Sequence, residues 1–144
     1  MSEKNIPRNR VSEDNINKLK DNEIFVFGSN ESGRHGKGAA KTAMKWGAIY
    51  GQAEGLQGRT YGIPTKDSAI RRVLTINEIK PYVDRFIKFA INNPDKIFLV
   101  TEIGCGLSKM KPKNIAPLFN SAYVVENIYL PYRFWKKMKI DSTS

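Results

Sequence analysis

FVFGSNESGRHGKGAA, residues 25–40, is the stretch that decides the predicted fold. It opens in a run of aromatic and β-branched residues (24–27) that is typical of a buried strand. A glycine-rich loop (33–38) follows and leads into a helix-forming segment (39–46). In α/β proteins this order of strand, loop and helix brings backbone N–H groups up to a phosphate. The stretch therefore favours a phosphate-bearing ligand over a purely structural glycine turn, although it fits neither a P-loop nor a dinucleotide fingerprint.

The rest of the chain alternates between strand patterns and helix patterns. Apolar residues recur at helical spacing from Ile79 to Ile91, and Thr75 with Glu78 predicts a capping box before them. The alternation predicts an α/β fold of three layers (α/β/α) with a mixed, mostly parallel sheet, in one domain of 144 residues. Further strands are predicted at 59–65, 96–101 and 127–131, and a further helix at about 114–124.

Three segments carry weaker patterns. The first ten residues are polar, which predicts poor order before a core of about residues 11–140. Residues 11–21 are mixed and fit either an edge strand or a short helix. Residues 47–58 hold four glycines and predict a long loop or a broken helix end.

The composition limits the classes of protein and partner. Lysine and arginine number 24 against 14 acidic residues, which gives a net charge of +10 and favours polyanions such as nucleic acid or nucleotides. Dispersed lysines can also serve solubility alone. The single cysteine excludes an intramolecular disulfide and fits a reducing cytosol. Since the sequence has neither a long apolar run nor the apolar core of a signal peptide, we expect a cytoplasmic protein with no membrane partner.

The predicted strands end in segments that are suited to a ligand. In parallel sheets, ligands bind beyond the carboxyl ends of the strands. These ends carry residues 28–38, 64–67 and 104–108, which are rich in glycine and small polar side chains. We therefore expect the three segments to meet in one binding site.

Taken together, four motifs resemble the macro domain family. They are FVFGSN (25–30), HGKGAA (35–40), YGIPTK (61–66) and IGCGL (103–107). The resemblance is greatest to the branch that contains the antitoxin partner of DNA-targeting ADP-ribosyltransferases and the human terminal ADP-ribose glycohydrolase. The chain is also similar to small macro-like proteins encoded by phages. The resemblance implies a macro-domain-like fold and a small-molecule ligand, ADP-ribose or a derivative, with its diphosphate between the two glycine loops.

The predicted ligand-binding residues come from these loops and from the segment after the last strand. The Asn30 amide can donate to and accept from a ribose diol, or it can cap its own loop. Phe134 can stack on adenine or pack in the core, and Cys105 is interpreted as a small structural residue of the diphosphate loop. The full set is Gly28, Ser29, Asn30, Gly33, His35, Gly36, Lys37, Gly38, Ala39, Pro64, Thr65, Lys66, Ile103, Gly104, Cys105, Gly106, Leu107, Ser108 and Phe134.

Two residues are candidates for catalysis. By resemblance, Lys66 stands where the family branch has a lysine that attacks the anomeric carbon of an ADP-ribosyl group, a role open to a desolvated lysine. One version of that chemistry pairs the lysine with an acid directly after IGCGL, where this chain has Ser108. Asp67 and Glu102 could substitute only if their side chains turn into the pocket, and the alternation of side chains along a strand counts against Asp67, the neighbour of Lys66. His35 could serve as a general base or line the pocket. One histidine and one cysteine make no ligand cluster, so neither a metal nor another cofactor is expected.

Three functions follow from these patterns. The first is a protein that binds an ADP-ribose-containing, NAD-derived nucleotide, and sequesters a signal in a phage counter-defence role inside the host cytoplasm. The second is an ADP-ribosyl hydrolase or ADP-ribose phosphate phosphatase, acting on modified protein, nucleic acid or a free metabolite. The third is a nucleic-acid-binding protein, suggested by the basic segment 133–139. Ser108 in place of an acid favours binding over hydrolysis.

Overall fold

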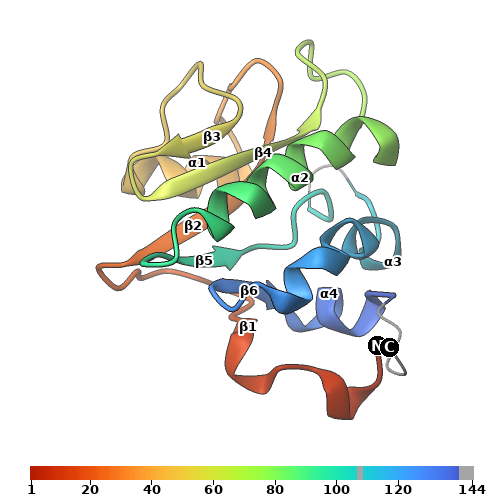
Figure 1. Cartoon of the computed structure of the whole chain (residues 1–144). Helices are drawn as coiled ribbons and strands as arrows, with labels where there is room; N and C mark the ends of the chain where they lie inside the picture. Colours follow the sequence, from red (N-terminus) through yellow and green to blue (C-terminus); the bar gives the residue numbers. More distant parts are fainter. Residues whose placement is uncertain (107–108, 140–144) are drawn as a thin grey trace.

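A computed structural model describes residues 1–106 and 109–139. Its centre is a six-stranded sheet in the order β1-β6-β5-β2-β4-β3 (Figure 1). Neighbouring strands run parallel except β3, which is antiparallel to β4. The predicted mixed, mostly parallel sheet is confirmed. The strands are β1 (Val11–Ser12), β2 (Glu23–Asn30), β3 (Gly55–Gln57), β4 (Thr60–Lys66), β5 (Ile97–Val100) and β6 (Ile128–Pro131).

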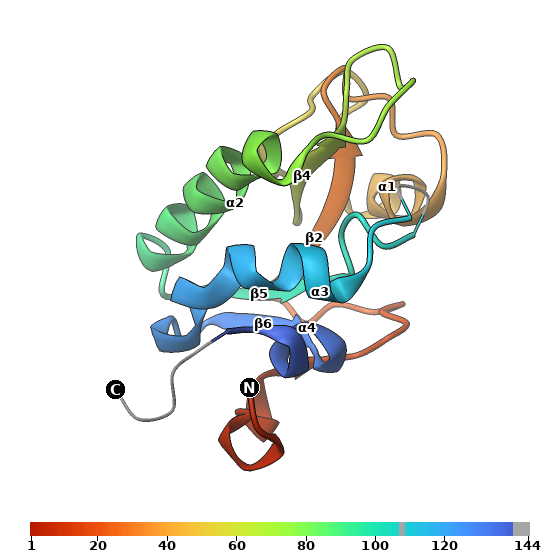
Figure 2. The same cartoon turned by 90° about the vertical axis from the view of Figure 1, so that its right-hand side faces the viewer.

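Helices cover both faces of this sheet and complete the three layers (Figure 2). The long helix α2 and a 3-10 helix at Ala116–Val124 pack on one face, and α1 packs on the other. Of the described residues, no helix combines the length and the apolar character needed to cross a membrane. The α-helices are α1 (Gly38–Ala43), α2 (Ile76–Ile91), α3 (Pro112–Ile115) and α4 (Tyr132–Lys137).

The apolar residues of strand β2 form a nearly continuous run, not an alternation of apolar and polar residues, because both faces of the strand are buried. Ile24 and Val26 belong to the apolar cluster beneath α2, whereas Phe25 and Phe27 belong to the cluster beneath α1. A central parallel strand is buried on both faces, so apolar residues are required at successive positions. Strand β2 is therefore held in the interior of the sheet, and the glycine loop begins where this strand ends.

Helix α2 begins as the sequence predicts. The Thr75 hydroxyl accepts a hydrogen bond from the Glu78 amide at 3.2 Å, and the Glu78 carboxylate accepts one from the Thr75 amide at 2.9 Å. The predicted capping box is therefore confirmed. Arg72 donates two further hydrogen bonds to Glu78, and these lower the pKa of the Glu78 carboxyl to about 2.

The first ten residues, for which the sequence predicts poor order, contact the rest of the protein at several points. They form two 3-10 turns, Ile6 is buried in the main core, and the Met1 ammonium donates to the carbonyls of Lys136 and Met138 at 3.1 and 2.8 Å. Ile6 anchors this segment in the core, and the C-terminal segment supplies the backbone acceptors for the Met1 ammonium. Strand β1 follows at once, as the edge strand that was one of the two readings of residues 11–21.

Two predicted helical or loop segments also differ in detail. Residues 47–58, expected as a loop or a broken helix end, contain the edge strand β3. The helix expected at 114–124 is realised as α3 followed by a 3-10 helix. Pro117 has no N–H, so it cannot make the α-helical hydrogen bond at that position.

Candidate functional site

An open cleft of about 870 Å³ lies at the carboxyl ends of β2, β4 and β5. Its walls are the end of β2, the end of β4, the loop leading into α1 and the loop after β5. The strand ends that the sequence expects to meet are therefore side by side. The predicted residues that line the cleft are Gly28, Ser29, Asn30, Gly36, Lys37, Gly38, Ala39, Thr65, Lys66, Ile103, Gly104, Cys105 and Gly106.

Other predicted residues do not line this cleft. Gly33 lies against the backbone of residues 51–52, and Pro64 pairs with Ser29 in the sheet. Leu107 and Ser108 lie outside the described residues.

His35 points away from the cleft and into the protein. Only 3% of the residue is exposed, its Nε2 lies 3.2 Å from Oε1 of Gln57, and its ring meets Phe27 edge-on at 5.2 Å. Its Nδ1 is buried without a partner among the described residues. The expectation that His35 lines the pocket or acts as a base is corrected, because Phe27 and Gln57 form a site for the ring inside the fold.

Phe134 is a core residue. It is fully buried and packs against Phe119 with ring centroids 5.8 Å apart. Of its two predicted roles, the structure supports packing and not stacking on a ligand.

Asn30 holds the glycine loop in place. Its Oδ1 accepts hydrogen bonds from the Ser32 hydroxyl and the Arg34 amide at 2.8 and 2.9 Å, and its Nδ2 donates to the Arg34 carbonyl at 2.9 Å. These are the bonds of a loop cap. Asn30 thus shapes the wall of the cleft, and its side-chain acceptor is already used by the loop.

Five cleft residues were absent from the predicted set. Arg34, Ala40 and Thr101 lie within segments that the sequence analysis names, and Glu102 was considered there only as a possible acid, so none of the four had been assigned to ligand binding. Ile70 lies outside those segments; it belongs to the loop after β4 and adopts a positive φ of 58°. The Asp67 carboxylate holds this loop by accepting the amides of Arg71 and Arg72 at 2.8 and 3.2 Å.

The cleft combines open backbone with positive charge. A Cβ atom added at Gly36 or at Gly106 would meet no described atom within 4 Å, so both loops present bare backbone to empty space. The N-cap residue of α1, Lys37, gives no side-chain cap to the helix. Arg34, Lys37 and Lys66 line the same space. This arrangement suits an anion, since amides and cations both stabilise negative charge.

Glu102 is the one carboxylate among the described residues that line the cleft. Its two oxygens each lie 2.6 Å from a guanidinium nitrogen of Arg133. This bidentate pair neutralises Glu102 at the edge of the cleft, so the cleft keeps its net positive charge.

Cys105 lies in the loop after β5 and is half-buried. Burial, with a smaller contribution from the charge of Glu102, raises the pKa of the thiol from its ordinary 9.0 to about 11. The nucleophilic thiolate is therefore scarce at neutral pH.

We expect iodoacetamide to label Cys105 about 100-fold more slowly in the folded protein than in guanidinium chloride, because two pKa units reduce the thiolate fraction about 100-fold. The rate should keep rising with pH until about pH 11. Mass spectrometry of quenched samples measures both. Equal rates in the folded and unfolded protein would contradict this environment for the thiol.

The described residues contain no cluster of histidine, cysteine or acidic side chains that could hold a metal ion. Comparison with protein-family models, with curated proteins and with solved structures gives no match. The site is therefore interpreted from its own geometry and from the motifs that form it.

Proposed function

We propose that this protein binds ADP-ribose, or a nucleotide that contains it, in the cleft at the ends of β2, β4 and β5. The observation that carries the proposal is the pair of glycine loops that face one space, with open backbone at Gly36 and Gly106. Backbone amides on two sides can hold a diphosphate, and the FGSN, GKGA, IPTK and IGCG motifs supply these loops in the order typical of macro domains. A volume of about 870 Å³ is within the range of small-molecule sites.

The charges favour binding over turnover. Arg34, Lys37 and Lys66 outnumber the single acid of the described cleft, Glu102, and the bidentate pair with Arg133 occupies both oxygens of that acid. A general acid must be free to pass a proton to the leaving group. Lys66 then acts as a charge that contacts the diphosphate, and the protein sequesters its ligand unchanged. Hydrolysis of an ADP-ribosyl linkage through Lys66 is the alternative.

Isothermal calorimetry with ADP-ribose, AMP and pyrophosphate tests the proposal. We expect ADP-ribose to bind most tightly, and mass spectrometry to find it chemically unchanged after heat denaturation of the complex. Lys66→Ala should weaken binding by about 10- to 100-fold, the effect of one charge-assisted hydrogen bond. Lys88→Ala, which removes an exposed lysine from α2 outside the cleft, should leave the affinity unchanged.

Two results would contradict sequestration in different ways. In the first, wild type releases ADP-ribose from a modified substrate, and Lys66→Ala abolishes this release but still binds ADP-ribose. The protein is then a hydrolase of the lysine type, because a nucleophile acts mainly in the transition state and contributes little to ground-state binding. If none of the three compounds produces heat or raises the melting temperature, the cleft does not take ADP-ribose.

A further inference from the structure

A second groove, of about 340 Å³, lies next to the cleft between the start of α3 and helix α4. These two helices lie side by side in both views (Figures 1 and 2). Five of the six residues that line the groove are cations. The six are Lys111, Pro112, Lys113, Arg133, Lys136 and Lys137.

Most of this positive charge is not neutralised by ion pairs within the part of the chain that the structure describes. Lys111, Lys113 and Lys137 form no ion pair with any residue in 1–106 or 109–139. Lys136 has only a 3.8 Å contact with Glu3, and both side chains are about half exposed. Like charges gathered in this way repel one another, so an anion placed between them is stabilised by several charges together.

The packing of the two helices holds these cations in place. Ile115 of α3 and Phe134 and Trp135 of α4 are fully buried in the same apolar cluster. These anchors fix the backbone from which the exposed lysines extend. The fold therefore fixes the backbone positions of the groove, from which the exposed cationic side chains extend.

The groove and the cleft share one ion pair. Glu102 lines the cleft, Arg133 lines the groove, and their side chains join at 2.6 Å. The groove and the cleft therefore adjoin at this ion pair.

We infer that this groove binds the phosphate backbone of a single-stranded nucleic acid. Lysine stems and Pro112 provide apolar walls for a sugar or a base, while the ammonium groups at the rim reach the phosphates. Helix α4 has six residues, about 9 Å, so the groove spans a short piece of one strand. Nucleic acid could bind in the groove whether or not the cleft binds ADP-ribose, so the inference goes beyond the proposed function.

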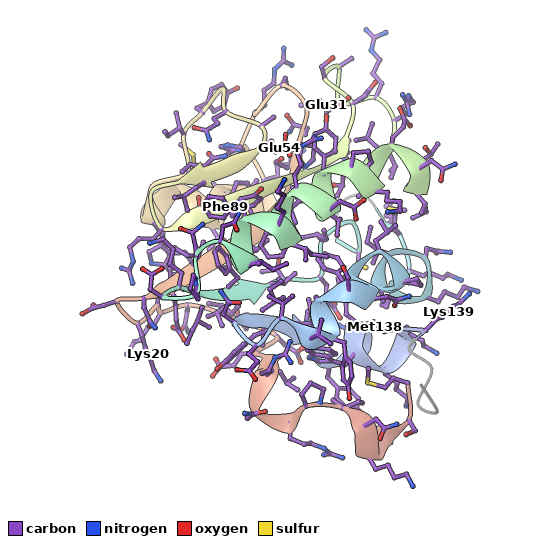
Figure 3. All side chains as sticks on the ribbon, in the orientation of Figure 1. Lys20, Glu31, Glu54, Phe89, Met138 and Lys139 are labelled. Carbon is purple, nitrogen blue, oxygen red and sulfur yellow. The ribbon has the colours of Figure 1, made fainter. Side chains whose placement is uncertain are left out.

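The test compares two triple variants by fluorescence anisotropy with a labelled oligothymidylate of about 12 nucleotides. The groove variant is Lys111→Ala, Lys113→Ala, Lys137→Ala. The control is Lys18→Ala, Lys20→Ala, Lys88→Ala, which removes the same charge from exposed lysines that do not line the groove. Lys20 and Lys139, which follows the groove residues, lie on opposite sides of the molecule (Figure 3).

We expect the groove variant to lose on the order of tenfold or more in affinity, and the slope of log affinity against log salt to fall by about 2, the value for three phosphate contacts on a single strand. The control should keep both the affinity and the slope near those of wild type. Circular dichroism should find all three proteins equally folded, since only exposed lysines change.

Three outcomes would overturn the inference. Equal losses in the two triple variants would indicate general attraction by the net charge, and no loss in either would exclude the groove. If polyglutamate of equal length binds as tightly as the oligonucleotide and is lost in the same variant, the groove is a surface for an acidic protein. ADP-ribose binding is measured separately on the groove variant, so failure of this inference leaves the proposed function standing.

Discussion

Replacement of Arg10 with alanine should lower the free energy of unfolding by about 3–5 kcal/mol. Arg10 is 8% exposed, and its guanidinium lies 5.1 Å above the ring centre of Trp135. It donates hydrogen bonds of 2.7–3.2 Å to backbone carbonyls at the end of the 3-10 helix Ala116–Val124, just after it, and at the start of β6. These carbonyls belong to Ala122, Tyr123, Val125 and Ile128.

The large effect follows from what the substitution leaves behind. Removal of the guanidinium removes all of these charge-assisted hydrogen bonds from a buried site, and a hydrogen bond to a charged group contributes about 1.5–3 kcal/mol. The Ala122 and Val125 carbonyls each keep one backbone donor, the amides of Val125 and Ile128 at 3.0 and 3.1 Å. Burial lowers the pKa of Arg10 below its ordinary value, but an arginine still remains charged. Because the carbonyls share that charge, the residue connects the N-terminal segment to the chain before β6.

Arg85→Ala is the matched control, measured by urea denaturation alongside Arg10→Ala. Arg85 makes a bidentate pair with Glu54 at 2.7 and 3.2 Å, but its side chain is 55% exposed (Figure 3 labels Glu54). An exposed pair contributes at most about 1 kcal/mol. Similar losses in the two variants would show that Arg10 is no more important than a surface ion pair.

Sequence patterns predicted the elements whose burial is regular. Strand β2 and helix α2 carry apolar residues at the periods of a buried strand and an amphipathic helix, and the Thr75–Glu78 box marks the helix start. The meeting of the strand ends then follows from parallel topology, which places all carboxyl ends on one edge. For the same reason the glycines of residues 36–38 and 103–106 could be expected in one cleft.

The inward turn of His35 could not be predicted in this way. Its partner Gln57 stands 22 residues away on β3, an edge strand hidden in a glycine-rich segment without strand periodicity. Gln57 also accepts the Ile49 amide at 2.7 Å and donates to the Gln52 carbonyl at 3.0 Å. Such a polar network depends on contacts between distant segments, which local patterns do not encode. Ile70 was not predicted to line the cleft for a similar reason, because the conformation of the loop after β4 places it there and no local sequence pattern indicates this.

Gly33→Ala should destabilise the protein by about 2–4 kcal/mol, combining a strained backbone with overpacking. Gly33 has a φ of +71°, and a Cβ atom there would lie 2.5–2.7 Å from backbone atoms of Gly51 and Gln52. Its carbonyl accepts the Gly51 amide at 2.8 Å, and its amide donates to the Asn30 carbonyl at 2.9 Å. No side chain can move aside to make room, so the loop itself must shift.

Gly36, three residues further along the same loop, should behave in the opposite way. A Cβ atom there meets no atom of residues 1–106 or 109–139 within 4 Å, and the backbone does not need a positive φ. Gly36→Val should therefore change the free energy of unfolding by less than about 0.5 kcal/mol. The new side chain extends into the cleft, where the proposed diphosphate would approach the bare backbone. We expect its affinity for ADP-ribose to fall at least as far as that of Lys66→Ala.

Thermal melts and calorimetry on the two variants separate the roles of these glycines. Gly33→Ala should have a lower melting temperature, and saturating ADP-ribose should recover part of the loss if the loop can still close around the ligand. Gly36→Val should melt like wild type without ligand and gain little when ADP-ribose is added. A Gly36→Val protein that binds ADP-ribose as tightly as wild type would show that the ligand does not lie against this loop. The diphosphate would then have to be sought at the loop after β5, with Gly106→Val as the next variant.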